Sequence, residues 1–193
     1  MIHLLMATKF EAAELIETAE KFSDLHWKLS DGIILYITGV NPVTAAESTS
    51  KYLRNLDPEY DTIINAGIAG CLDENIPQNS IIVPDRFEME PAETHLGIGN
   101  TFEPIGDGKI KLFTCNFPVW EEDRKKLLKS QGGTLVDMEG YSIAYCCQQA
   151  GFQLTSVKVV SDHCSRNTQE EFIEKAKGAI TVLSDHLVKN YLS

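Results

Sequence analysis

The sequence predicts an α/β fold: a three-layer αβα sandwich in which helices cover both faces of a central mixed, mostly parallel sheet. Two observations lead to this prediction. Short apolar runs alternate with segments of helical periodicity along the whole chain. The apolar runs are continuous, as in strands that are buried on both faces. Because no repeat, low-complexity segment or linker interrupts this alternation, we expect residues 1–193 to form a single domain.

The first half of the chain contains four apolar runs that predict strands, at Ile2–Ala7, Gly32–Val40, 61–70 and 80–89. The third run is expected to end in a glycine turn at the motif NAGIAG. Residues 9–22 carry Ala, Leu and Glu at helical spacing and predict the first helix. Residues 42–56 begin with Pro42, which suits the first position of a helix, and predict the second.

The second half continues the alternation, with strands expected at 109–115, 134–138 and 152–162 and helices at 120–133 and 139–151. The last helix has the clearest signal. Thr168 and Glu171 form a capping-box pattern, and apolar residues then recur every three or four positions as far as Tyr191. The segment Pro91–Gly108 has four glycines and little pattern, which is typical of a mobile or interface loop.

The composition excludes several classes of protein. There are 28 Asp and Glu against 17 Lys and Arg, a formal charge of −11, whereas surfaces that bind nucleic acid or anionic membranes need basic patches. No apolar run reaches the roughly 18 residues of a membrane helix, and the first residues lack the features of a signal peptide. Five cysteines without a CxxC pair predict reduced, buried thiols and neither a disulfide framework nor a zinc site. We therefore expect a cytoplasmic protein.

Polar or glycine residues stand at the ends of several predicted strands. In α/β folds ligands bind at the carboxyl ends of the strands, so these segments are expected to converge on one site. They are Thr8–Glu11, Gly39–Asn41, Asn65–Gly70, Asp137–Glu139 and Ser161–Asp162.

Three carboxylates fall at such strand ends: Glu11, Glu139 and Asp162. Taken singly, each glutamate is compatible with a solvated residue at a helix start, and Asp162 with a helix N-cap. Their shared type of position favours an acid–base site. The motif SDHCS does not predict a catalytic triad, because Ser161, Asp162 and His163 are successive and point to opposite faces of a strand. NAGIAG matches neither a dinucleotide fingerprint nor a P-loop and is also compatible with an ordinary tight turn.

The motifs ATKFEAAEL, GVNPVTAA, NAGIAG, VDMEGYSIAYCC and VKVVSD, together with their order, resemble the nucleoside phosphorylase/nucleosidase superfamily. The resemblance is strongest to the nucleosidases that act on methylthioadenosine and S-adenosylhomocysteine and to the futalosine hydrolases. It covers residues 1 to about 190. The chain is shorter than usual for the family, mainly around Glu93–Lys111.

This resemblance implies roles for individual residues. Glu11 would activate the attacking water, and Asp162 would protonate or hydrogen-bond N7 of the leaving purine. Glu139 would hold the ribose hydroxyls. The other residues that the resemblance places at the substrate are Val40 and Met138 on the ribose side, Ala69 and Gly70 at the floor of the base site, Phe117 stacked on the purine with Pro118 after it, Ser161 beside Asp162, and Phe172 over the sugar and its 5′ substituent. Asp137 would be a structural cap.

The predicted function is that of an N-ribosyl hydrolase that releases adenine from a 5′-substituted nucleoside, with no metal and no cofactor. Methylthioadenosine, S-adenosylhomocysteine and aminodeoxyfutalosine are the candidate substrates, and the last would imply menaquinone biosynthesis. A purine nucleoside phosphorylase and a non-catalytic nucleoside-binding protein are the alternatives. The phosphorylase is disfavoured because no arginine stands in a matching loop to hold a phosphate dianion.

Two residues depart from the family pattern. Ile68 replaces a hydroxyl residue that would support Asp162, and Pro118 lacks the backbone N–H that could bind the base. The resemblance also implies a homodimer, in which the Pro91–Gly108 loop would contribute to the 5′-substituent pocket of the neighbouring subunit.

Overall fold

The long strand β5 (Thr62–Cys71) lies at the centre of the sheet in the computed structural model, which describes residues 1–94, 97–99, 102–166 and 169–192. β5 pairs in parallel with β1 (Ile2–Met6) and, along most of its length, with β12 (Leu154–Asp162). Its last residues pair antiparallel with β11 (Gly133–Asp137). β5 therefore brings three strand ends together, and the site described below lies there.

The remaining strands extend the sheet on both sides of β5. Beyond β1 lie β4 (Ile33–Ile37), β3 (His26–Ser30) and β2 (Glu20–Lys21), and beyond β11 lie β10 (Lys111–Thr114) and β7 (Arg86–Met89). The short strand β6 (Ile81–Ile82) pairs with β12. β8 (Ala92–Thr94) and β9 (Gly97–Gly99) form a separate two-stranded sheet.

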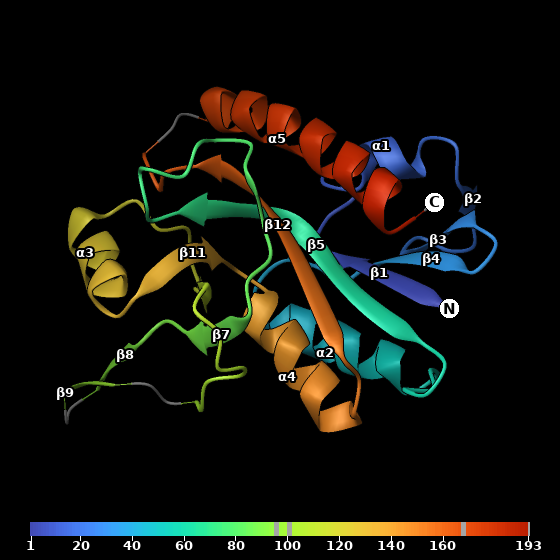
Figure 1. Ribbon diagram of the computed structural model, residues 1–193, viewed down its shortest axis with the longest axis horizontal. Helices are drawn as coiled ribbons and strands as arrows, with labels where there is room; N and C mark the ends of the chain where they lie inside the picture. The colour runs from blue at the N-terminus through green and yellow to red at the C-terminus, as the bar shows by residue number, and fades with distance from the viewer. Residues whose placement is uncertain (95–96, 100–101, 167–168, 193) are drawn as a thin grey trace.

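Helices cover both faces of this sheet, as Figure 1 shows. α5 (Gln169–Asn190) and the short α1 (Ala13–Ile16) lie on one face, and α2 (Pro42–Leu53) and α4 (Gly140–Ala150) lie side by side on the other. α3 (Glu122–Ser130) stands at the end of the sheet near β11. The predicted α/β fold with three layers and a mixed sheet is confirmed.

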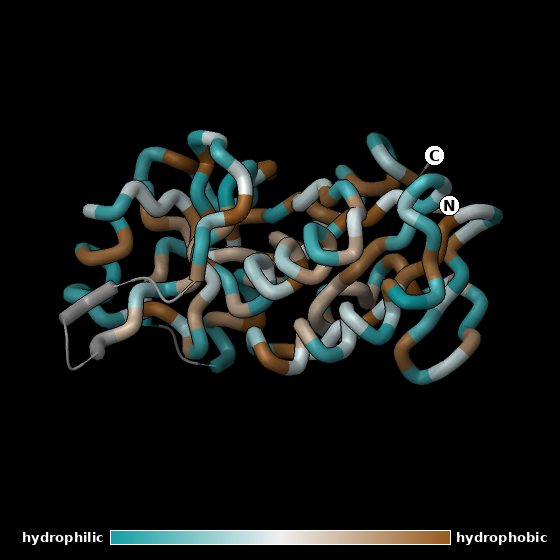
Figure 2. The backbone as a smooth tube through the Cα atoms, turned by 90° about the horizontal axis from the view of Figure 1, so that it is seen from below, coloured by the Kyte–Doolittle hydropathy of each residue, from teal (hydrophilic) through white to brown (hydrophobic). Residues whose placement is uncertain are grey.

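Each helical layer buries its own apolar face. The buried residues Ala179, Leu183 and Leu187 of α5 pack on the sheet residues Leu4 and Ile64. A second cluster joins the opposite face of the sheet to α2 and α4 through Ala45, Leu53, Ile143, Cys147 and Ile63. Hydrophilic segments recur along the outline of the backbone (Figure 2). The apolar spacing that predicted these helices is thus the spacing of their buried faces.

Three predicted elements are wrong in extent. Residues 9–22 form only the four-residue α1, because Thr8 and Glu11 bond to each other in a turn and Glu20–Lys21 pairs with β3. Residues 80–89 form two strands, β6 and β7, which Pro84 separates; proline cannot donate to a sheet ladder. NAGIAG is not a turn. It lies within β5, whose glycines pair with β12.

The predicted capping-box residue Thr168 and part of the Pro91–Gly108 loop lie outside the described residues. All five cysteines are free and buried, as predicted. Within the described ranges, every helix is too short or too polar to cross a membrane.

Candidate active site

A cavity of about 590 Å³ opens where β1, β5, β11 and β12 end. Its volume is that of a pocket for a small molecule. The five polar strand ends converge on it, as the sequence predicted. All eleven predicted site residues line it: Glu11, Val40, Ala69, Gly70, Phe117, Pro118, Met138, Glu139, Ser161, Asp162 and Phe172.

Glu11 is folded into the site and is only 6% exposed, so it is not the solvated helix-start residue that its position also allowed. Its Oε2 accepts hydrogen bonds from the backbone N and the Oγ1 of Thr8, both at 3.0 Å, and Thr8 Oγ1 accepts one from Glu11 N at 3.1 Å. This is the reciprocal pattern of a capping box. Its Oε1 accepts from the backbone N of Ile68 at 3.0 Å, which ties the carboxylate to β5.

Gly67 makes this position of Glu11 possible. A Cβ atom on Gly67 would lie 2.8 Å from Glu11 Oε1, closer than real Cβ contacts, and 3.7 Å from the Nζ of Lys158. Gly67 also pairs with Lys158 across the parallel ladder. Because residue 67 has no side chain, the carboxylate of Glu11 and the ammonium group of Lys158 both fit beside this part of β5.

Glu139 reaches the site from the junction of β11 and α4. It is 8% exposed, and its Oε1 accepts a hydrogen bond from the backbone N of Asn41 at 2.9 Å. Asn41 has φ of +82° and caps α2 by accepting from the backbone N of Thr44 at 2.9 Å. With ψ of 158° this conformation lies outside the left-handed helical region and is strained for a residue other than glycine, at a cost of about 1–3 kcal/mol. The GVNP turn thereby aims one backbone N–H at Glu139 and places Val40, which is 42% exposed, at the mouth of the cavity.

Asp137 forms a buried ion pair with Lys158, with 2.9 Å between Oδ2 and Nζ. Lys158 is 3% exposed and Asp137 is 7% exposed. The carboxylate also accepts hydrogen bonds from Thr114 Oγ1 at 2.7 Å and from the backbone N of Gly140 at 2.9 Å. Asp137 thus accepts a hydrogen bond from the first residue of α4 and is also the partner of a buried cation, which the sequence did not predict.

Sequence reasoning missed Lys158. The signal was present, because a lysine in the apolar run SVKVV of a strand buried on both faces needs an acidic partner. The identity of that partner depends on β12 lying beside β5 with Asp137 at the end of β11, which no local pattern reports.

Burial and the charges of neighbouring groups shift the pKa values of Glu11, Glu139 and Lys158. Burial raises the pKa of Glu11, and hydrogen bonds from Ile68 and Thr8 and the charge of Lys158 only partly oppose the shift. Burial, and then the charge of Asp137, raise the pKa of Glu139 to about 8. Burial by itself would lower the pKa of Lys158, but Asp137, Glu139 and Glu11 more than offset it and raise that pKa. Near neutral pH Glu139 therefore holds its proton, and Lys158 keeps its charge.

Asp162 lies at the end of β12 and is partly exposed to the cavity. Its Oδ1 accepts from the backbone N of Cys164 at 2.6 Å, and its Oδ2 accepts from Ser161 Oγ at 3.0 Å. A Cβ atom on Gly70 would lie 2.8 Å from Cys164 Sγ and 3.8 Å from Asp162 Oδ1, so the floor here also requires a glycine. Ile68 supplies no hydroxyl, and Ser161 supports Asp162 in its place.

Aromatic side chains form the outer walls of the cavity. Phe117 is 70% exposed, Trp120 is 43% exposed, Phe10 is 38% exposed and Phe172 is 40% exposed. All four line the opening. Exposed rings around a polar floor can hold a flat heterocycle by face contact and leave its edge to the carboxylates.

The charge of the lining restricts the chemistry. Four carboxylates face the cavity, those of Glu11, Asp137, Glu139 and Asp162, and among the described residues no lysine or arginine lines it. In the described part of the chain, no group of three His, Cys, Asp or Glu residues is arranged to hold a metal ion. The arrangement can transfer protons and stabilise positive charge, and it opposes the binding of an anion.

The raised pKa of Glu139 predicts a pH-dependent stability. A carboxyl group whose pKa rises from 4.5 to about 8 on folding stabilises the folded state below pH 4.5, and this contribution is lost as the pH rises to about 8. Glu139→Gln removes the ionisation and keeps an acceptor for Asn41. Relative to the parent, the free energy of unfolding of this variant should therefore increase between about pH 5 and about pH 8 in urea titrations. Parallel pH profiles for the two proteins would contradict the shift.

Loss of Lys158 should be costly because it leaves Asp137 buried and unpaired. Lys158→Met is expected to lower the free energy of unfolding by about 3–5 kcal/mol in denaturant titrations. The double variant Lys158→Met/Asp137→Asn should recover part of that loss, since the uncompensated charge is gone. Lys28→Met is the control: Lys28 forms an exposed pair with Asp31, and its removal should change stability little. A double variant that is no more stable than Lys158→Met would argue against the pair.

Comparison with known proteins supports the resemblance inferred from the sequence. The model of the phosphorylase superfamily matches residues 111–192. The 5′-methylthioadenosine/S-adenosylhomocysteine nucleosidase of Staphylococcus aureus is 25% identical over 217 residues, which cover 91% of this chain and 93% of that protein.

Solved structures share the fold over nearly the whole chain. A mutant of the methylthioadenosine nucleosidase of Helicobacter pylori, with 5′-methylthioadenosine in its active site, superimposes with a TM-score of 0.83 at 16% identity and covers 97% of this chain and 96% of its own. The futalosine hydrolase of the same organism gives a TM-score of 0.80 at 16% identity, with 96% and 94% covered. At such identities these structures show the fold alone. Taken with the family model and the Staphylococcus relative, they confirm that this chain resembles the nucleoside phosphorylase/nucleosidase superfamily, as its motifs predicted.

Proposed function

We propose that this protein is a hydrolase that cleaves the N-ribosidic bond of a 5′-substituted adenosine-type nucleoside and releases adenine. One observation carries the proposal: Glu11, Glu139 and Asp162 line a single cavity that contains no described cation in its lining. The names of the Staphylococcus and Helicobacter relatives support the same reaction class.

The reaction builds positive charge on the sugar and negative charge on the departing purine. In our proposal Asp162 donates a proton to N7 of the purine, and Ser161 and the backbone N of Cys164 orient its carboxyl group. Glu11 takes a proton from the attacking water. Paired carboxylates serve other glycosidic bonds in the same way, and each positioned proton transfer contributes about 10²–10⁴-fold to the rate.

Glu139 is proposed to bind the ribose hydroxyls, with Met138 along the sugar. Its hydrogen bond to Asn41 occupies Oε1, so Oε2 remains for a hydroxyl. Lys158 does not line the cavity and is proposed as a positioning residue. It offsets the charge of Glu11, Asp137 and Glu139 and thereby allows three carboxyl groups to lie close together.

A phosphorylase is the less favoured alternative because of the charge of the cavity. Phosphorolysis must hold a phosphate dianion, usually with arginines, whereas four carboxylates face this cavity. Water is therefore the proposed nucleophile. Turnover that rises in proportion to added phosphate would contradict this assignment.

A panel of nucleosides tests the function and separates the remaining alternatives. Methylthioadenosine, S-adenosylhomocysteine and aminodeoxyfutalosine are each incubated with the protein, and free adenine is measured by chromatography. We expect release of adenine from at least one of them without phosphate. Binding without release would instead support a non-catalytic nucleoside-binding protein. Release from aminodeoxyfutalosine alone would place the protein in menaquinone biosynthesis.

Asp162→Asn should reduce kcat by about 10²-fold or more, because an amide cannot deliver a proton to N7. The carboxamide keeps the size of the side chain and one acceptor for Cys164, so binding of a substrate analogue should change little. Single-turnover release of adenine measures the effect. A rate within about threefold of the parent would remove Asp162 as the acid.

Gly67→Ala should impair catalysis more than folding. The added Cβ would lie 2.8 Å from Glu11 Oε1 and would displace the proposed base. We expect kcat to fall by about tenfold or more, the cost of a misplaced catalytic group. Gly178→Ala on α5 is the matched control, since its Cβ would meet nothing within 4 Å. Equal activity of the two variants would show that Glu11 does not depend on the space above Gly67.

We also propose that the protein is a cytoplasmic homodimer. The free, buried cysteines support a reducing compartment. Phe102, in the Pro91–Gly108 loop, is 53% exposed and contacts the ring of Tyr141, which in turn stacks near the exposed Tyr145 of α4. Exposed aromatic clusters of this kind are common at interfaces. Light scattering at micromolar concentration should give twice the monomer mass, and Phe102→Ser should weaken the dimer. A fully active monomer would contradict the dimer.

A further inference from the structure

One wall of the cavity is a loop that side-chain packing holds only in part: Cys115 and Val119 are buried in an apolar cluster with Val136. It spans Cys115–Glu121, between β10 and α3, and contributes Phe117, Pro118 and Trp120 to the lining. Phe117 and Trp120 are largely exposed, at 70% and 43%. Burial of these rings therefore does little to position the residues that carry them, and backbone contacts must contribute to the placement of this part of the loop.

The guanidinium group of Arg124, in the first turn of α3, binds the backbone of this loop. Nη2 donates to the carbonyl oxygen of Phe117 at 3.2 Å, and Nη1 donates to that of Pro118 at 3.0 Å. Nη1 also donates to Glu121 Oε2 at 3.0 Å. One planar cation thus fixes two successive carbonyl groups at the point where the chain turns into the cavity.

Glu90 fixes the guanidinium in turn. Its two carboxylate oxygens accept from Nε and Nη2 of Arg124, both at 2.8 Å, in the bidentate geometry that only arginine offers. The backbone N of Glu90 donates to Thr114 O at 2.9 Å, which anchors this residue to the edge of β10. The chain of contacts therefore runs from the sheet through Glu90 and Arg124 to the Phe117–Pro118 backbone.

We propose that Arg124, oriented by Glu90, is a positioning residue that sets the purine-facing wall of the cavity. This inference rests on the proposed function. Both carbonyl groups of the Phe117–Pro118 pair are bonded to Arg124, and Pro118 has no N–H, so the wall presents the ring of Phe117 to the base. The purine is held there by face contact, and its edge is left to Asp162.

Selective loss of base affinity is the expected consequence of removing Arg124. Arg124→Gln should weaken binding of free adenine by about tenfold and raise KM of the nucleoside to a similar extent, while kcat stays within about threefold. Binding of methylthioribose, which contacts only the sugar side, should not change. Glu90→Gln should act in the same direction, and the double variant should be no worse than Arg124→Gln alone, since the two residues act through one chain of contacts.

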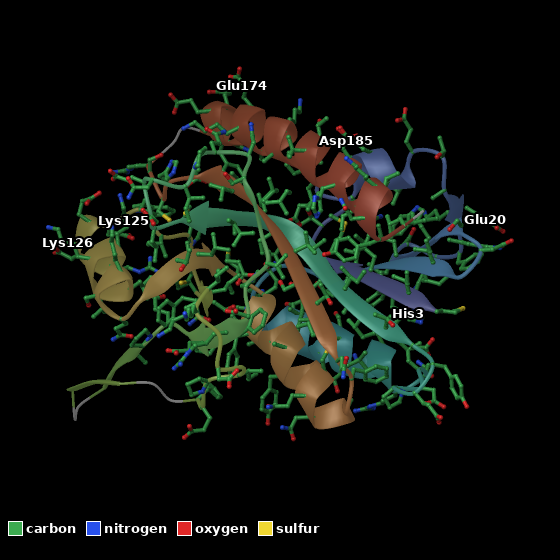
Figure 3. The ribbon with its side chains drawn as sticks, viewed as in Figure 1. His3, Glu20, Lys125, Lys126, Glu174 and Asp185 are labelled. Carbon is green, nitrogen blue, oxygen red and sulfur yellow. The ribbon has the colours of Figure 1, made fainter. Side chains whose placement is uncertain are left out.

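The tryptophan in the loop provides a direct readout. The chain has two tryptophans, and Trp27 is buried in the core, so Trp27→Phe leaves the emission of Trp120 to report on adenine binding. Lys126→Gln is the control: Lys126 belongs to the same helix and projects away from the sheet in Figure 3. Arg124→Lys keeps the charge but not the planar fork, and should give an intermediate loss if Arg124→Gln folds poorly.

Each outcome bears on one proposal or the other. Unchanged adenine affinity in Arg124→Gln and Arg124→Lys would overturn the positioning role. Equal losses for adenine and methylthioribose would also overturn it, because they would indicate a general distortion of the site. Adenine binding that depends on Arg124 in a protein that hydrolyses no nucleoside would contradict the proposed function and leave the positioning role intact. A parent protein that does not bind adenine would contradict both.

Discussion

The buried ion pair between Lys158 and Asp137 is the interaction on which the rest of the site depends. Three carboxyl groups, those of Glu11, Asp137 and Glu139, lie at neighbouring strand ends and are each less than a tenth exposed. Burial of an isolated carboxylate costs several kcal/mol, and mutual repulsion adds to it. One ammonium group in the middle of β12, opposite Gly67, lowers that cost for all three. The cation stays out of the cavity lining, and Glu139 keeps its Oε2 for a ligand.

The glycines of β5 also help to bring the functional groups of the site close together, by leaving space for them. β5 carries glycines at residues 67 and 70, and each provides space for a functional group of a neighbouring element: Glu11 at the first, Cys164 and Asp162 at the second. A strand with side chains at both positions would push these groups away from the sheet. Glycine weakens a strand by about 0.5–1 kcal/mol relative to alanine. β5 offsets this by pairing with β1, β12 and β11 along its length.

The sequence predicted the layers of the fold and the convergence of the site, because both follow from local patterns. Continuous apolar runs mark buried strands, and polar residues at their carboxyl ends must meet in an α/β sheet. What it could not predict depends on pairing between distant segments. The continuation of β5 through NAGIAG follows from its ladder with β12, and the shortening of the first helix follows from the pairing of Glu20–Lys21 with β3.

The side-chain partners were hidden for the same reason. Lys158 and Asp137 are 21 positions apart, and Glu90 and Arg124 are 34 positions apart, so no helical or strand periodicity connects them. Taken alone, each of the four residues is ordinary for its segment. Lys158 is a strand residue, Asp137 precedes a helix, Glu90 is an acid at a strand end, and Arg124 is a cation on a helix. The two pairs that they form become evident only when the sheet brings β7, β11 and β12 into one structure.

The charge balance of the cavity ties the proposed chemistry to this architecture. Glu139 has a pKa of about 8, so near neutral pH a proton rather than a second cation balances the cluster. A ribosyl group that gains positive charge as its bond to the purine breaks would favour the ionised form of Glu139, and the carboxylate would then stabilise that charge at short range in a low dielectric. A phosphate dianion in the same place would meet four acidic side chains and, among the described residues, no lysine or arginine in the lining. The electrostatics that make the site costly to fold are therefore those that favour attack by neutral water on a cationic sugar, which is the step that distinguishes hydrolysis from phosphorolysis.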